Sequence, residues 1–283
     1  FCCGEALVDM LPEALADGRE AFVPYAGGAV FNTAIALGRL GVSVGLVTGL
    51  STDFFGDFLR DGLVASGVES RYAVLSDRPT TLAFVRLDGG QARYRFYDEQ
   101  SAGRMLQVTD MPALPASTSA LFFGGISLAC EPGAEAYTEL AERAGERVIM
   151  VDPNIRPGFI EDDARYRERL ARLFAVADVV KVSDEDLAWL EPGAESMAGQ
   201  VAGLRHQGVG LVLVTRGGEG VGAFLPDGSR MHVPVSPVEV VDTVGAGDTF
   251  NAGFLASLEG SGLLTREFLA APDATRLGEA IAQ

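Results

Sequence analysis

The stretch "VVDTVGAGDTFNAG", residues 240–253, joins a Gly-Ala-Gly turn to a segment whose apolar residues have helical spacing. Phe250, Phe254 and Leu258 recur on one face of that segment, which predicts a helix packed on a core, with Asp248 in its first turn. A glycine-rich turn that opens a helix attracts anions, because free N–H groups and the helix dipole point at it. The carboxylate of Asp248 would repel such an anion, and this conflict requires an explanation.

Two explanations account for Asp248. An aspartate in the first turn of a helix is commonly a capping residue. However, three small residues, Gly245, Ala246 and Gly247, together with a second acid at Asp242, make a tighter turn than capping requires. If the anion is a phosphoryl group in transfer, the turn receives its developing charge while Asp248 accepts the proton of the acceptor hydroxyl. This second explanation predicts a kinase, with a nucleoside triphosphate and Mg²⁺ approaching from the other side of the turn.

Short β-forming runs alternate with helical patterns along most of the chain. Residues 53–66 are one such helical pattern, with Phe54, Phe58, Leu59 and Leu63 at helical spacing. The β-forming runs are VGLVT (44–48), ALFFG (120–124), VIMVD (148–152), ADVVK (177–181) and LVLVT (211–215). This alternation predicts an α/β fold with a doubly wound, mostly parallel sheet flanked by helices.

One region does not fit the alternation. Residues 80–99 read as two strands joined by a turn at Asp88-Gly89-Gly90. A hairpin does not belong within a βαβ succession, so we place it outside the main sheet. With the irregular segment 8–28 it predicts a small β lid, formed by about residues 10–26 and 80–98 and inserted in a single domain that spans 1–283.

Composition narrows the classes of partner. The 22 Lys and Arg residues against 39 Asp and Glu residues give a formal net charge of −17, which argues against a nucleic-acid or acidic-membrane partner. No apolar run reaches the roughly 18 residues of a membrane span, and the start lacks a basic leader region. The three cysteines include an adjacent pair and no Cys-x-x-Cys motif, so neither a disulfide framework nor a zinc site is predicted. We therefore expect a cytoplasmic protein.

A second glycine turn precedes another predicted helix. Gly28 ends an irregular segment, and Asn32 lies in the first turns of the helix that follows. The Asn side chain offers two donors and an acceptor, which suits vicinal sugar hydroxyls, although a local capping role is equally compatible with the pattern. An acid, Asp9, follows the first apolar run and could be either a ligand contact or a turn residue.

Two stretches resemble the signatures of ribokinase-like (PfkB-type) carbohydrate kinases: "VVDTVGAGDTFNAG" and "YAGGAVFNTAIALGRLG" (25–41). The resemblance covers essentially the whole chain. It implies that Asp248 is the general base, that residues 245–247 form the anion hole, and that Asp9, Gly28 and Asn32 contact the sugar. It also implies ATP and Mg²⁺ as cofactors, with K⁺ as a further candidate.

Other segments, including "DPNIRPGF" and "VKVSDEDLAWL", are most similar to the bacterial fructokinase branch of that family. The implied reaction is transfer of the ATP γ-phosphoryl group to a primary hydroxyl of fructose, with 2-keto-3-deoxygluconate kinase or another sugar or nucleoside kinase as alternatives. One departure is Asp98, where many fructokinases carry Arg. With Glu99 it disfavours an acidic substituent on the sugar.

Further residues are assigned to the ligands less directly. Arg156 follows a strand, at the edge where doubly wound folds bind ligands, and could steady the sugar or a phosphoryl oxygen or form a loop salt bridge. "VTRGGEG" resembles the family turn beside the nucleotide phosphates. The residues that the resemblance assigns to the nucleotide are Thr215, Gly217, Gly220 and Ser183, and the one assigned to the metal, through water, is Asp186. An acidic run at 184–186 is also typical of a helix N-terminus.

The sequence also bears on three other protein classes. A catalytically silent sugar-binding protein on the same fold is disfavoured by the intact Asp248 and glycine turn. A nicotinamide oxidoreductase is excluded because no Gly-x-Gly-x-x-Gly turn follows the first strand, and a P-loop kinase because no Walker A motif exists. The expected partners are a small-molecule sugar and ATP, and the chain is expected to be a monomer or a homodimer.

Overall fold

The computed structural model describes residues 1–88, 91–235 and 244–283. Asp242 and the turn residues Gly89 and Gly90 lie outside the described residues. Within them, eight strands form one sheet in the order β14-β13-β12-β11-β10-β9-β1-β4. These strands are β1 (Cys2–Cys3), β4 (Leu46–Val47), β9 (Ala120–Gly124), β10 (Val148–Asp152), β11 (Val179–Ser183), β12 (Leu211–Thr215), β13 (Val221–Phe224) and β14 (Arg230–Val233). The six strands from β12 to β4 pair in parallel, and β13 and β14 add an antiparallel edge.

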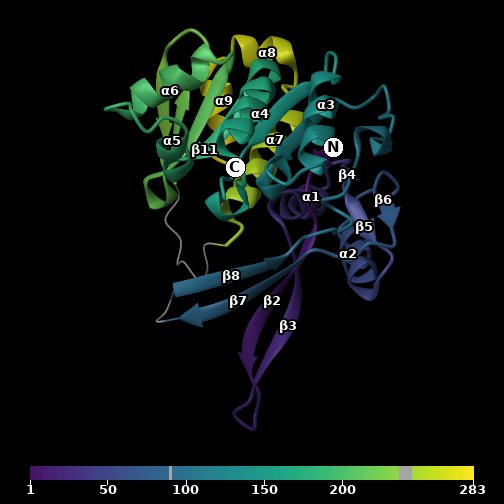
Figure 1. Ribbon diagram of the computed structural model, residues 1–283. Helices are drawn as coiled ribbons and strands as arrows, with labels where there is room; N and C mark the ends of the chain where they lie inside the picture. Colours follow the sequence, from purple (N-terminus) through teal and green to yellow (C-terminus); the bar gives the residue numbers. More distant parts are fainter. Residues whose placement is uncertain (89–90, 236–243) are drawn as a thin grey trace.

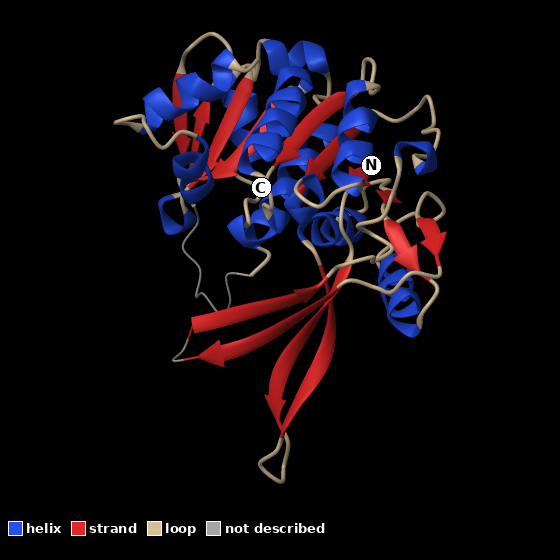
Figure 2. Cartoon of the chain, in the orientation of Figure 1, coloured by secondary structure: helices blue, strands red, loops and turns tan. Residues whose placement is uncertain are grey.

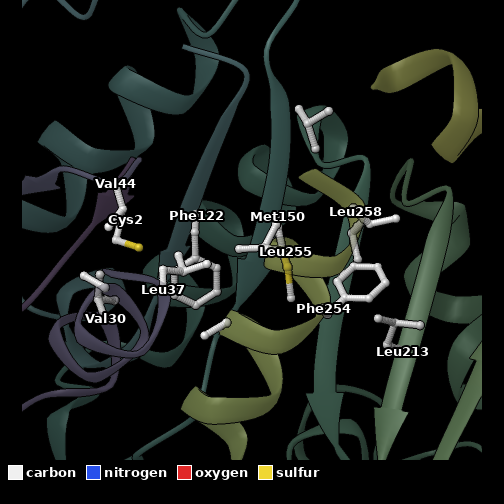
Figure 3. Close-up of a cluster of buried hydrophobic side chains, with 14 of the residues drawn as sticks. Cys2, Val30, Leu37, Val44, Phe122, Met150, Leu213, Phe254, Leu255 and Leu258 are labelled. Carbon is white, nitrogen blue, oxygen red and sulfur yellow. The ribbon is translucent and has the colours of Figure 1, made fainter. Parts of the chain in front are cut away.

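Helices cover both faces of this sheet (Figure 2), because successive strand residues point to opposite faces and both sets are apolar. One face packs against α1 (Ala29–Arg39), α7 (Ala246–Gly260), α8 (Arg266–Ala270) and α9 (Ala274–Ile281), and α2 (Phe54–Ala65) packs against α1 at the edge of that core. The other packs against α3 (Gly133–Glu142), α4 (Asp163–Val176), α5 (Asp184–Leu190) and α6 (Met197–His206). Figure 3 shows part of the first core, where Val30 and Leu37 of α1 and Phe254 and Leu258 of α7 lie on the sheet. The predicted doubly wound fold is confirmed.

A second sheet, in the order β3-β2-β7-β8, projects from this body and forms the lid (Figure 1). Its strands are β2 (Leu7–Ala14), β3 (Glu20–Gly27), β7 (Leu82–Asp88) and β8 (Gln91–Tyr97). A separate pair, β5 (Gly49–Ser51) and β6 (Val74–Ser76), lies beside α2. The segment 8–28, expected to be irregular, is instead mostly a regular hairpin.

One detail of a predicted helix differs from the structure. Of the four apolar residues at helical spacing in α2, Leu59 and Leu63 are buried as expected, but Phe54 and Phe58 are 74% and 40% exposed. The reason is that α2 lies at the periphery, where only a narrow face packs against α1 and neighbouring strands. None of the described helices is long and apolar enough to cross a membrane.

Candidate active site

A cavity of about 870 Å³ lies between the lid and the carboxyl edge of the main sheet. This volume is within the usual range for small-molecule sites. The lid contributes Asp9 from β2 and Phe96 from β8, and the main body contributes residues that follow its strands. Seven of the residues proposed from the sequence line this cavity: Asp9, Gly28, Asn32, Arg156, Gly245, Gly247 and Asp248.

Asp248 lies in the first turn of α7 and is 7% exposed. Gly245 is the N-cap, and its φ of 76° is the left-handed conformation that favours glycine. No side chain caps this helix. The carboxylate of Asp248 instead accepts a hydrogen bond at Oδ2 from Nδ2 of Asn32, at 3.0 Å. The capping explanation for Asp248 therefore does not describe its side chain, which faces α1 and the cavity.

The environment makes Asp248 a base near neutral pH. Burial raises the pKa of its carboxyl from 3.8 to about 7, against the opposing effects of the Asn32 hydrogen bond and the Lys181 ammonium. A group with this pKa is deprotonated about half the time at pH 7 and is a stronger base than an exposed aspartate.

The sugar side of the cavity holds a second perturbed carboxyl. Burial raises the pKa of Asp9 to about 6. A Cβ at Gly27 would lie 2.1 Å from Oδ2 of Asp9, so glycine at that position makes room for the carboxylate. Gly28 is the N-cap of α1, with φ of 104°. Asn32 lies one helical turn further along α1 and lines the cavity. The structure thus brings Asp9, Asn32 and Asp248 to one cavity from three distant parts of the chain.

Glu5, which the sequence reading did not single out, supports this arrangement. It is 8% exposed; Oε1 accepts from the N–H of Ala29 at 3.0 Å and Oε2 from the N–H of Ser127 at 3.2 Å. Burial raises its pKa. A Cβ at Gly125, whose φ is 68°, would lie 2.0 Å from Oε1 of Glu5. Glu5 therefore ties the start of α1, and with it Asn32, to the end of β9.

Asp98, which stands where many fructokinases carry Arg, has hydrogen-bond donors and a cation around its carboxylate. Asp98 is buried and accepts hydrogen bonds from the hydroxyls of Thr81, at 2.7 Å, and Ser101, at 3.0 Å. Its Oδ2 also lies 3.4 Å from Nη1 of Arg104. The cavity is lined by further arginines, Arg104 and Arg156 among them, so Asp98 does not make it uniformly acidic.

Arg156 lies at the cavity rim and is exposed. Its Nη1 donates to the carbonyl of Ile155, at 3.0 Å, and no ion pair links it to an acid within the described residues. The loop salt bridge considered as an alternative is therefore absent from the described part of the chain, and the guanidinium faces solvent at the cavity.

The residues assigned to the nucleotide lie at the carboxyl ends of β11 and β12, outside the main cavity lining. Thr215 ends β12, and Gly217, with φ of 49°, begins a short 3₁₀ turn that Gly220, with φ of 86°, follows. Ser183 caps α5: its Oγ accepts from the N–H of Asp186 at 3.0 Å. These positions lie at one edge of the sheet, as the sequence pattern predicts, because the carboxyl ends of parallel strands meet at the same edge.

Asp186 forms the other half of that cap. Its Oδ2 accepts from the N–H of Ser183 at 3.2 Å, and its Oδ1 from the N–H of Ile155 at 2.9 Å. No group of three His, Cys, Asp or Glu side chains that could hold a metal occurs among the described residues. The carboxylate is fixed by backbone donors, which suits a contact to Mg²⁺ through water better than direct ligation.

A buried polar cluster that the sequence reading missed lies beneath the Gly-Ala-Gly turn. Nζ of Lys181 donates to Oδ2 of Asp152 at 2.9 Å, and Nδ2 of Asn251 donates to the same oxygen at 2.7 Å. These residues come from β11, β10 and α7. No local pattern announces such a cluster, although one sequence signal exists: Lys181 is the only lysine of the chain.

An α/β fold whose carboxyl edge carries an anion-binding turn, a near-neutral base and a covered cavity defines an enzyme that transfers a phosphoryl group to a hydroxyl. The family model described as "pfkB family carbohydrate kinase" matches residues 2–283, and the chain belongs to that family.

Its relatives are similar along almost the full chain. A fructokinase of Rhizobium leguminosarum bv. trifolii is 49% identical over 274 residues, covering 96% of this chain and 83% of the relative. The structure of a Xylella fastidiosa fructokinase with bound ATP superposes with a TM-score of 0.88 at 31% identity, covering 99% of this chain and 88% of that one. A Vibrio cholerae O395 fructokinase bound to fructose, ADP and calcium gives a TM-score of 0.83 at 25% identity, with coverage of 99% and 88%.

Proposed function

We propose that this chain is an ATP-dependent fructokinase that transfers the γ-phosphoryl group of ATP to a primary hydroxyl of fructose, giving fructose 6-phosphate and ADP. One observation carries the proposal: Asp248, with its pKa raised to about 7, lines the cavity beneath the lid, directly after the Gly-Ala-Gly turn and beside Asn32. The fructokinase relatives favour fructose over other sugars.

In this mechanism, fructose binds under the lid, where Asp9, Gly28 and Asn32 contact its hydroxyls. Asp248 accepts the proton of the attacking hydroxyl while the new oxygen–phosphorus bond forms and the bond from the γ-phosphorus to the ADP oxygen breaks. The N–H groups of residues 245–247 stabilise the charge on the transferring group, and Arg156 contacts a phosphoryl oxygen or the sugar. Mg²⁺, held by Asp186 through water, would neutralise charge on the nucleotide phosphates.

The nucleotide lies along the ends of β11 and β12, where Ser183, Thr215, Gly217 and Gly220 flank its phosphates. K⁺ is a further candidate cofactor, and comparing rates in KCl and in tetramethylammonium chloride at equal ionic strength tests it. The proposed location is the cytoplasm, which the three buried free cysteines favour. The proposed assembly is a monomer or a homodimer, which light scattering distinguishes.

A coupled ADP-release assay with fructose, ribose, 2-keto-3-deoxygluconate, tagatose and adenosine tests the substrate. We expect the largest kcat/KM with fructose. A larger value for the keto acid or the nucleoside would replace fructose with that alternative, and no stimulation by any of them would favour a silent sugar-binding protein.

The Asp248→Asn variant tests the base. We expect kcat to fall by at least about 10²-fold while the affinities for fructose and ATP, measured by calorimetry, change little. Near-normal turnover in this variant would remove Asp248 from the proposed role.

A further inference from the structure

Lys181 stands apart from every other cation in the chain. Of the 22 Lys and Arg residues it is the only lysine, so every other basic side chain of this class is an arginine. It is also 5% exposed, and lysine is among the residue types least often buried. The presence of a lysine where the rest of the chain uses arginine, and not only the positive charge, therefore needs an explanation at this position.

The ammonium of Lys181 lies against the Gly-Ala-Gly turn. A Cβ built at Gly247 would stand 3.0 Å from Nζ of Lys181, and both residues line the cavity. Lys181 lies near the carboxyl end of β11. Because Val179, two residues earlier, packs in the core beneath α7, Lys181 points to that same face of the sheet.

A counterion holds the ammonium in place. Oδ2 of Asp152 accepts from Lys181 at 2.9 Å and from Nδ2 of Asn251 at 2.7 Å, while Oδ1 accepts from the N–H of Asn154 at 3.2 Å. Gly247 and Asn251 are one helical turn apart on α7 and share a face. The cluster therefore fixes the first turns of α7 over the ends of β10 and β11, with the ammonium directly beneath the turn.

We propose that Lys181 is a further residue of the phosphoryl-transfer site, whose ammonium adds a full positive charge to the anion-binding turn and contacts the transferring phosphoryl group. This inference rests on the proposed kinase function. Backbone N–H groups and the helix dipole supply only about half a charge at such a turn, whereas the group in transfer carries charge on three oxygens. A buried ammonium interacts strongly with that charge, because little water screens it.

The alternative is that Lys181 only neutralises Asp152. The other ion pairs among the described residues are made by arginine, so that task alone does not require the one lysine. A compact ammonium fits between Asp152 and Gly247, where even a Cβ at position 247 would approach Nζ to 3.0 Å, so the larger planar guanidinium would be crowded here.

A double-mutant cycle separates the two roles. The variants are Lys181→Met, Asp152→Asn and the double variant, each measured for kcat, for KM of fructose and ATP, and for Tm. Lys181→Met leaves a buried carboxylate without its partner, so we expect both Tm and kcat to fall. In the double variant no charge is left unpaired, and we expect Tm to recover while kcat stays about 10²-fold below the wild type, with KM for fructose changed less than about threefold.

Two results of this cycle would overturn the proposal. If the double variant regains wild-type kcat, Lys181 serves only to neutralise Asp152. If Asp152→Asn alone loses as much kcat as the double variant, the loss belongs to the carboxylate. Both are read against a wild type that is active on fructose, so they are distinct from a failure of the proposed function, in which the wild type itself shows no sugar-dependent ADP release.

A spectroscopic test uses the wild-type protein. Labelling with lysine enriched in ¹⁵N at Nζ gives one ammonium signal, because the chain has one lysine. We expect this signal to shift when ADP, Mg²⁺, aluminium fluoride and fructose, which together mimic the group in transfer, are added, and to stay in place with fructose alone. An unchanged signal in a complex whose formation calorimetry confirms would contradict the contact.

Discussion

At the scale of single residues, the site solves the conflict between a carboxylate and an anion by burial. An exposed aspartate with a pKa near 3.8 would be charged whenever ATP approaches, and it would be a weak base. Burial raises the pKa of Asp248 to about 7, so the repulsion is reduced and the basicity increased by the same change of environment. The Asn32 hydrogen bond to Oδ2 limits this shift and orients the carboxylate toward the cavity.

This pKa predicts the pH dependence of turnover. Only deprotonated Asp248 accepts the hydroxyl proton, so kcat/KM for fructose should rise about tenfold per unit of pH below about 7 and level off above it. The measurement is the coupled assay from pH 5.5 to 9 at saturating ATP, with the coupling enzymes in excess. A profile that is flat between pH 5.5 and 7.5 would contradict the assignment.

The site residues that lie in recognisable local patterns were predictable, and those that act through distant partners were not. Asp248 follows its own glycine turn, and Asn32 follows Gly28 within one helical turn. The role of Lys181 depends on its contacts with Asp152 and Gly247, which the sheet and α7 bring close to it. Glu5 is likewise linked to the N–H of Ser127 across 122 positions. Periodicity cannot anticipate contacts of that span.

At the scale of elements, the buried parallel strands were the most predictable. β9, β10 and β12 begin and end where their apolar runs do, because a strand covered on both faces is apolar throughout. The hairpin of β2 and β3 was missed because it carries Pro12 and Pro24. β3 is an edge strand, and the pairing of β2 with β7 ends at Met10, so neither proline needs to donate to a second neighbour.

Two carboxylates attach the lid hairpin to the body: Asp53, at the start of α2, accepts from the N–H and the hydroxyl of Thr80, and Asp98 is buried at the other end of the hairpin. Thr81, directly before β7, and Ser101, shortly after β8, both donate to Oδ1 of Asp98, and Arg104 pairs with Oδ2. Arg104 in turn bonds to Glu161 of the main body, at 2.7 Å. The base of the hairpin is therefore held at a fixed position over the cavity.

Asp98→Ala should loosen this attachment. It leaves two buried hydroxyls and a guanidinium without their acceptor, which costs on the order of 2–4 kcal/mol of unfolding free energy. We expect a lower denaturation midpoint and a KM for fructose raised at least about fivefold, because the lid no longer covers the sugar in one position. Asp61→Asn, at an exposed position of α2, is the matched control and should change neither. Equal behaviour of the two variants would show that Asp98 does not hold the lid.

At the scale of the whole molecule, acidic side chains affect stability both through the net charge of the chain and through the carboxyls that line the cavity. The formal charge of −17 repels itself within the compact state. Three cavity carboxyls, Glu5, Asp9 and Asp248, add a second unfavourable contribution when they are charged. Burial disfavours their charged form and so raises the pKa of each. The folded ligand-free protein is therefore most stable where these three groups are protonated.

The stability of the ligand-free protein should consequently fall as pH rises toward the range in which it is active. A carboxyl whose folded pKa exceeds its unfolded value binds more protons in the native state, so its stabilising contribution is complete below about pH 4 and is lost as pH rises through the folded pKa. For Asp248, with a folded pKa of about 7, the loss between pH 6 and 8 is about 1.4 kcal/mol, or about 3 °C in Tm. Calorimetric scans of the wild type and of Asp248→Asn at both pH values measure it, because an amide does not titrate. The variant should lose about 3 °C less than the wild type over this interval, whereas the exposed-site control Asp61→Asn should follow the wild type. Parallel losses in all three proteins would mean that Asp248 does not titrate near neutrality, and the expected acid limb of the rate profile would then need another group.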